Sequence, residues 1–173
     1  MLELLGRKNV EESPEWAAHG REQEPRALAG YQRKYETDVE HNVFLIHKKY
    51  DWLSCSPDFL ELPGYAAGGE IKCRDMYKNY RKFRQLAIDH EGTVQAMPAC
   101  DRHQVQGAMW LTGFSSWWYV NYYNGDDLKG GTANKIWRVK IPRDRALIEA
   151  MELRCIEFMK DCYERAELEY DNR

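Results

Sequence analysis

Two carboxylates and a lysine occur at a spacing that could build a metal site. Asp58 follows Ser56-Pro57, and after a glycine-rich spacer the chain continues Gly69-Glu70-Ile71-Lys72. Carboxylate oxygens are the ligands that the hard cation Mg²⁺ prefers, so Asp58 and Glu70 are candidate ligands. A cation held between them could activate water and stabilise the transition state of phosphodiester hydrolysis. Lys72 would hold or deprotonate the attacking water, or neutralise charge on the phosphate.

Strands are the elements that would bring these side chains together. Side chains alternate between the two faces of a strand, so Glu70 and Lys72 share a face while Ile71 points to the core. A neighbouring strand that carries Asp58 would set its carboxylate beside Glu70. The same residues also fit two solvated strand ends joined by a glycine-rich turn at 63–69, and the short motif alone does not separate the two interpretations.

Four sequence blocks occur in an order that is typical of one nuclease family. Residues 19–27 are similar to a helix motif W-G-x-x-x-E-x-x-A, and residues 103–113 are similar to Q-V-Q-x-x-M-W-V-T-G. Between them, residues 54–58 and 69–73 carry the two acids and the lysine. Together the blocks resemble the lambda-exonuclease family, the YqaJ-like viral recombination nucleases of the PD-(D/E)xK superfamily.

The resemblance implies a role for each residue of the central blocks. Asp58 and Glu70 would bind the metal, with the backbone carbonyl of Ile71 as a further ligand. Lys72 would be the catalytic lysine. The cofactor implied is Mg²⁺, with Mn²⁺ as an alternative.

The outer two blocks would each contribute one side chain to the same site. Glu24 would complete the metal environment, directly or through water, whereas without the family pattern it would be a surface acid. Gln104 would orient water or substrate. Side chains two apart on a helix do not share a face, so at most one of Gln104 and Gln106 can point squarely to the site. The match to the family motif favours Gln104, and we expect Gln106 to be structural. Asp101 and His103 precede Gln104, and we assign His103 no chemistry.

The activity implied by the resemblance is digestion of one strand of duplex DNA from 5′ to 3′, which leaves a 3′ single-stranded tail. Members of the family form ring-shaped trimers and work with a single-strand annealing protein, so a homo-oligomer and such a partner are expected. Two departures stand out: Phe59 replaces a usual glycine, and no 5′-phosphate-gripping motif precedes Leu4. A truncated chain or another mode of 5′-phosphate capture would explain the second. An endonuclease or nickase of the same fold, or an inactive relative that binds DNA or a partner, therefore stays open.

Composition predicts one folded domain over residues 1–173. A hydrophobic content of 43% and an aromatic content of 13% argue against disorder. No apolar run is long enough to span a membrane, and the first residues do not resemble a signal peptide, so we expect a cytoplasmic location. The family resemblance implies a phage or prophage protein in a bacterial host. Five cysteines without a C-x-x-C pair predict free thiols rather than a zinc site.

The net charge of −3 is not that of a protein that coats DNA, but the basic residues are unevenly distributed. A cluster with interleaved aromatic residues follows the proposed catalytic strand. It fits either a solvated amphipathic helix or a surface that tracks DNA phosphates, and the neighbouring motif favours DNA. The candidate DNA-binding residues are Arg74, Lys78, Arg81 and Lys82.

The pattern along the chain predicts an α/β protein with a mixed sheet flanked by helices, and the family resemblance implies a restriction-endonuclease-like core. Ser13 and Pro14 would begin the first helix, and Pro25 would kink or divide it. A loop with helical character would carry the basic cluster. The expected helices cover 14–35, 98–112 and 143–170, and the expected strands cover 43–47, 52–60 and 69–73, which would form the catalytic sheet, together with 117–123 and 135–141.

Overall fold

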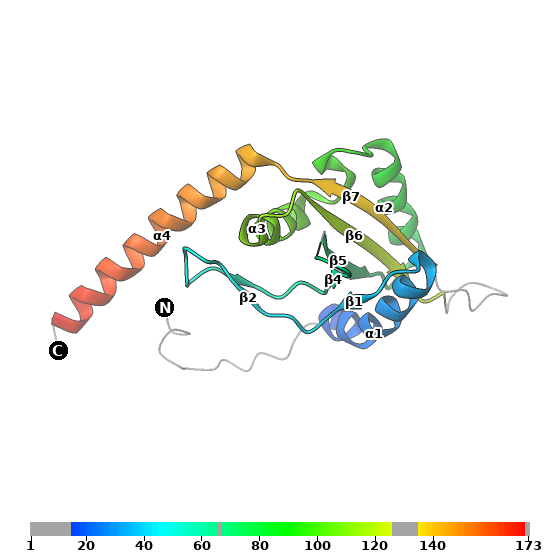
Figure 1. Ribbon diagram of the computed structural model, residues 1–173, viewed down its shortest axis with the longest axis horizontal. Helices are drawn as coiled ribbons and strands as arrows, with labels where there is room; N and C mark the ends of the chain where they lie inside the picture. Colours follow the sequence, from blue (N-terminus) through cyan, green and yellow to red (C-terminus); the bar gives the residue numbers. More distant parts are fainter. Residues whose placement is uncertain (1–14, 66, 126–134, 172–173) are drawn as a thin grey trace.

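The computed structural model describes residues 15–65, 67–125 and 135–171 (Figure 1). The described helices are α1 (Glu15–Tyr35), α2 (Tyr77–Asp89), α3 (Arg102–Thr112) and α4 (Arg145–Asp171), with 3-10 turns η1 (Val94–Ala96) and η2 (Ala99–Asp101) before α3. The strands are β1 (Val39–Glu40), β2 (Leu45–Ile46), β3 (Ser54–Cys55), β4 (Phe59–Glu61), β5 (Gly68–Cys73), β6 (Ser116–Tyr123) and β7 (Lys135–Pro142).

The main sheet has the order β1-β4-β5-β6-β7. The β5–β6 pair is parallel, and the other pairs are antiparallel. Parallel neighbours need a long crossover connection, and here that connection contains α2, the two 3-10 turns and α3. The predicted fold class, a mixed sheet flanked by helices, is confirmed.

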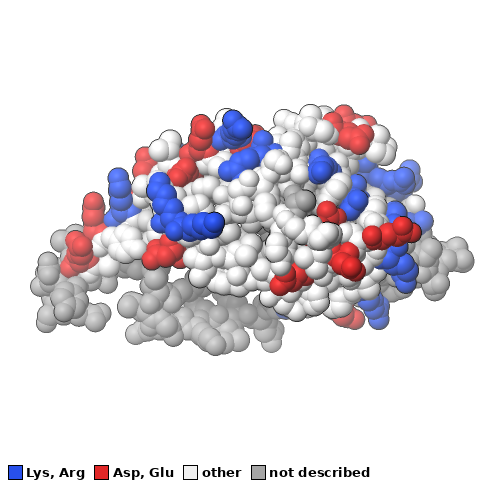
Figure 2. Space-filling model, in the orientation of Figure 1, with Lys and Arg blue, Asp and Glu red and all other residues white. Residues whose placement is uncertain are grey.

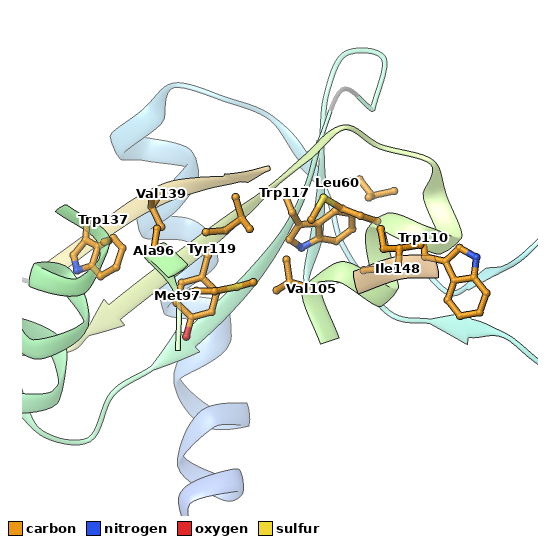
Figure 3. Packing of buried hydrophobic residues seen from close by; sticks show 14 of the residues in the cluster. Leu60, Ala96, Met97, Val105, Trp110, Trp117, Tyr119, Trp137, Val139 and Ile148 are labelled. Atoms are coloured by element: carbon orange, nitrogen blue, oxygen red, sulfur yellow. The ribbon is translucent and has the colours of Figure 1, made fainter. Parts of the chain in front are cut away.

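Both faces of this sheet are buried. On one face, Tyr31 of α1 packs with Ile71 of β5 and Val120 of β6. On the other face, α2, α3 and the first turns of α4 cover the sheet. Figure 3 shows Trp117 and Tyr119 of β6 in that second core. Strand alternation explains the division, because odd-numbered and even-numbered residues of β6 point to opposite faces.

The prediction that 43–47 and 52–60 belong to the catalytic sheet is wrong in part. β2 pairs with β3 in a separate two-stranded sheet, and of the strands in these two runs only β4 joins β5. The run 52–60 is divided because Pro57, which has no N–H to donate, lies between β3 and β4. Residues 77–89, expected as part of a loop, form the regular helix α2.

The helices also differ in detail from expectation. Pro25 lies inside α1, which continues through it as one helix, while the predicted cap at Ser13 and Pro14 lies outside the described residues. α4 begins against α3 and then extends away from the body of the molecule (Figure 1). Its distal part exposes Phe158 and Tyr163. Among the described residues, no helix combines the length and apolar character needed to cross a membrane.

Candidate functional site

The start of β4 fixes Asp58 against β5. Its backbone N–H donates to the Gly69 carbonyl at 3.2 Å, and its carboxylate Oδ2 accepts a hydrogen bond from the Ile71 N–H at 2.5 Å. Asp58 is therefore held on the edge of β5 through both its backbone and its carboxylate. Asp58 and Glu70 are brought together as predicted, although Asp58 immediately precedes β4 and only Glu70 lies within a strand.

Two glycines set how closely the strands around β5 approach. A Cβ atom built on Gly69 would lie 1.9 Å from Cζ of Phe59, and one on Gly68 would lie 2.2 Å from Cη2 of Trp117. Both aromatic rings thus lie directly on glycine backbone, from opposite faces of β5. The contacts leave no room for another side chain and fix the strand that carries Glu70.

Glu70, Lys72 and Gln104 form a closed set of contacts. Lys72 Nζ lies 2.8 Å from Glu70 Oε1 and donates to Gln104 Oε1 at 3.1 Å. Gln104 Nε2 in turn donates to the same Glu70 oxygen at 2.8 Å. Gln106 lies on another face of α3 and is fully buried, where it bonds to the Pro142 carbonyl.

Asp101, which sequence reasoning passed over, also reaches this set. Its Oδ1 lies 3.7 Å from Lys72 Nζ, and its Oδ2 accepts from the buried Tyr119 hydroxyl at 2.6 Å. The spacing from Asp101 to Gln104 could have predicted that both side chains reach Lys72, because residues three apart on a helix share a face. Asp101 is thus a second acidic neighbour of the lysine.

Arg74 is held within the fold rather than presented beside the other predicted DNA-binding residues. Its guanidinium donates to the Tyr119 hydroxyl at 2.8 Å and to Asn121 Oδ1 at 2.7 Å, and it lies 4.2 Å from the centre of the Phe83 ring. The remaining three candidates, Lys78, Arg81 and Lys82, are exposed on α2.

These side chains surround a cleft of about 510 Å³. Glu24 reaches its wall from α1, and Asp101 from η2. Asp58 lines it from just before β4, and Glu70 and Lys72 line it from β5. The structure therefore brings the residues of all four sequence blocks to one place, since Gln104 contacts Glu70 and Lys72. His103 is exposed and is not part of the cleft wall.

The cleft holds more negative charge than its lysine balances. Burial and the neighbouring Glu70 raise the pKa of Asp58 to about 8. Burial also raises the pKa of Glu70, although Lys72 opposes that shift. Burial alone would lower the pKa of Lys72, but Glu70 and Asp101 outweigh it and the pKa rises. Bringing a cation to such a cluster would favour its ionised carboxylates.

The oxygen atoms on this edge of β5 suit a hard divalent cation. The Gly69 carbonyl and the Ile71 N–H both point toward Asp58. The N–H and C=O of one strand residue point the same way, so the Ile71 carbonyl also faces this edge. Among the described residues, no group of three or more His, Cys, Asp or Glu side chains is arranged to hold a metal. Two carboxylates and a carbonyl nevertheless fit Mg²⁺, which keeps several waters and uses few protein ligands.

Charge on the surface is mixed rather than of one sign. Figure 2 shows Lys and Arg side chains interspersed with Asp and Glu on one face of the molecule. This agrees with the small net charge of −3. Any basic surface that binds an anionic ligand is therefore confined to a small part of the molecule.

Solved structures of exonucleases share this fold. The chain matches an alkaline exonuclease from Laribacter hongkongensis at 25% identity and a TM-score of 0.71, covering 99% of this chain and 78% of that one. The same exonuclease in complex with dAMP matches at 25% identity and a TM-score of 0.68, covering 97% and 76%.

A phage-related exonuclease from Haemophilus somnus shares the fold at 18% identity and a TM-score of 0.60, covering 87% of this chain and 71% of that one. No curated protein sequence matches the chain. A sequence model of the YqaJ-like viral recombinase domain matches residues 1–115, so the resemblance seen in the four blocks is confirmed. The chain belongs to the YqaJ-like viral recombinase family.

Proposed function

We propose that the chain is a divalent-cation-dependent deoxyribonuclease that removes nucleotides from the ends of duplex DNA, from 5′ to 3′. The observation that carries this proposal is the meeting of Asp58, Glu70 and Lys72 in one cleft, with Gln104 bonded to the last two. The relative at 25% identity is an exonuclease, and its dAMP complex supports a deoxynucleotide as the kind of ligand.

The proposal gives a task to each of the principal side chains of the cleft. Asp58, Glu70 and the Ile71 carbonyl would hold Mg²⁺ or Mn²⁺, with Glu24 near the same wall. When bound, the cation supplies Lewis-acid polarisation and lowers the pKa of water. Because the pKa of Lys72 is raised, its side chain stays an ammonium group and neutralises charge on the phosphate. Gln104 holds the side chains of Glu70 and Lys72 in place, because it is hydrogen-bonded to both.

The DNA contacts of the proposal lie along α2. Asn79 lines the cleft, and the exposed Lys78, Arg81 and Lys82 follow on the same helix, where they would contact phosphates. Arg74 would act at the cleft wall, through its contacts with Tyr119 and Asn121.

The proposal extends to the setting in which the enzyme works. It takes residues 1–173 as a single nuclease domain acting on duplex DNA in the bacterial cytoplasm. The family resemblance supports a homotrimer and a single-strand annealing recombinase as partners, and the viral recombinase family supports a role in phage-type recombination.

Digestion of linear duplex DNA tests the proposal. With Mg²⁺ present, we expect the strand with a 5′ phosphate to be lost and mononucleotides to appear, while a covalently closed circle stays intact because it has no ends. Product analysis on denaturing gels and by chromatography, with EDTA as the control, measures this. Cutting of the circle would replace the exonuclease with an endonuclease. No cutting of either substrate with Mg²⁺ or Mn²⁺ would refute nuclease activity.

The raised pKa of Asp58 predicts a pH-dependent effect of Mg²⁺ on stability. An unfolded aspartate titrates near pH 3.9, but burial and Glu70 raise the pKa of the folded Asp58 to about 8. The stability that its protonated form contributes is present below pH 4 or so and is lost as the pH rises through about 8.

In EDTA, ionisation of the buried Asp58 should therefore lower the Tm as the pH rises. Mg²⁺ competes with the proton, so it should raise the Tm more at about pH 8.5 than at about pH 6. Differential scanning fluorimetry measures both shifts, with Asp58→Asn as the control that should lose most of the difference. An equal Mg²⁺ shift at both pH values would count against a metal at this carboxylate.

A further inference from the structure

A second hollow of about 620 Å³ lies along α2, where this helix meets the end of α1 and the beginning of β7. Among the residues that the structure describes, four cations line it and no acidic residue does. We call it the basic hollow. Its cations are Lys34, Arg81, Arg84 and Lys135, and its aromatic wall includes Tyr77 and Trp137.

Within the described ranges, the positive charge of the basic hollow is not balanced by nearby acids. In the described part of the chain, none of its four cations lies within ion-pair distance of a carboxylate. Lys34 donates to the Ile136 carbonyl, and burial together with the neighbouring Arg84 lowers its pKa, as expected where cations are crowded. In a chain with a net charge of −3, such a concentration of one sign calls for an anion.

The aromatic wall adds a flat apolar surface to this charge. The rings of Tyr77 and Tyr80 stack at 6.0 Å and 15°. Tyr80 is buried, which supports the partly exposed Tyr77 from behind, and Lys135 Nζ lies 5.7 Å from the centre of the Tyr77 ring. Such a site can bind a nucleotide strand, because a base stacks on the supported ring while the neighbouring cations hold the backbone phosphates.

The basic hollow and the catalytic cleft have α2 as a shared wall. Asn79 lines the cleft, while its sequence neighbours Tyr80 and Arg81 line the hollow. We propose that the basic hollow binds a single-stranded DNA segment, with its phosphates on Arg81, Arg84 and Lys135 and a base against Tyr77. The choice of DNA among anionic ligands rests on the proposed function. The hollow would then hold a strand next to the cleft without taking part in its cleavage.

Binding of a labelled oligothymidylate in EDTA, where cleavage is blocked, tests this proposal. A strand of about a dozen nucleotides matches the site sizes of single-strand binders. Arg81→Ala/Arg84→Ala should weaken its binding about tenfold and reduce the salt slope by about 0.7 for each lost contact. The matched control Lys160→Ala/Arg165→Ala removes the same charge from exposed positions of α4 and should bind like the unchanged chain.

Three further variants, at Lys135 and Tyr77, test the fold and the contact with the base. Lys135 lines the hollow from β7, so Lys135→Gln removes a cation without altering α2 and should weaken binding. Tyr77→Ala should weaken binding about tenfold, while Tyr77→Phe keeps the ring and should bind normally. Thermal melting of every variant checks that the fold is retained.

Unchanged affinity in both Arg81→Ala/Arg84→Ala and Lys135→Gln would overturn the proposal, as would an equal loss in the α4 control. Equal weakening for a blunt duplex would overturn the assignment to a single strand. Cleavage is measured separately in Mg²⁺. A chain that cleaves nothing but binds the oligonucleotide through these residues would refute the proposed function and leave the hollow supported.

Discussion

Asp58→Asn and Glu70→Gln are each expected to reduce Mg²⁺-dependent cleavage of linear duplex DNA by at least about a hundredfold to a thousandfold. Both changes remove a negative oxygen donor from the edge of β5 while keeping the shape of the side chain. Asp58→Asn can still accept the hydrogen bond from the Ile71 N–H. Initial rates of nucleotide release measure the loss, and Glu149→Gln, an exposed change on α4, is the control.

The same substitution at Asp58 should make the metal-free protein more stable at high pH. Burial and the charge of Glu70 raise the pKa of Asp58 to about 8, so its ionised form is disfavoured in the folded chain. An amide removes that disadvantage, and the Tm in EDTA above about pH 8 should rise. Loss of cleavage with a gain of stability would separate a direct role from unfolding. Retained cleavage in Glu70→Gln would exclude its carboxylate as a required ligand.

Gly69→Ala is expected to destabilise the fold by about 3 kcal/mol or more, at the upper end of the range for overpacking. The added Cβ would lie 1.9 Å from the Phe59 ring. That ring has no exposed surface and is packed against Tyr31 at 4.5 Å between ring centres. It has nowhere to move, so β4 and β5 must separate. Urea denaturation followed by circular dichroism measures the change in the free energy of unfolding.

Two variants make this prediction specific. Gly20→Ala adds the same methyl group in α1 with no atom within 4 Å, so it should be neutral or stabilising. Adding Phe59→Leu to Gly69→Ala should recover part of the lost stability, because a smaller side chain leaves space above residue 69. A Gly69→Ala protein as stable as the original would show that the strands are not fixed by this contact.

The parts of the site that follow strand alternation could be predicted from the sequence. Glu70 and Lys72 share a face of β5 and Ile71 enters the core, because a strand has only two faces. Helix geometry likewise predicted that Gln104 and Gln106 would not share a face, and the family motif selected Gln104 as the one that faces the site. These inferences concern residues a few positions apart, where the local backbone alone decides the outcome.

The parts that depend on distant pairing could not be predicted. Whether β2 joins β5 or pairs with β3 depends on contacts between segments, and two-residue strands give almost no pattern. Arg74 appeared to belong to a basic surface, but its partners Tyr119 and Asn121 come from β6, across a parallel pairing that the sequence does not reveal. The basic hollow has the same origin, because α1, α2 and β7 each supply part of it.

The parallel β5–β6 pair also has a consequence for the order of folding. Local steps can form α2, α3 and the β4–β5 hairpin, but these leave the catalytic groups apart. The contact between Gln104 and Glu70 spans 34 residues, and it requires α3 to dock on a sheet whose central pairing is itself non-local. Contacts of this kind form slowly and late, because loop closure costs entropy before they contribute. Assembly of the cleft should therefore be among the last events of folding, so that partly folded chains hold their acids and lysine too far apart to act together.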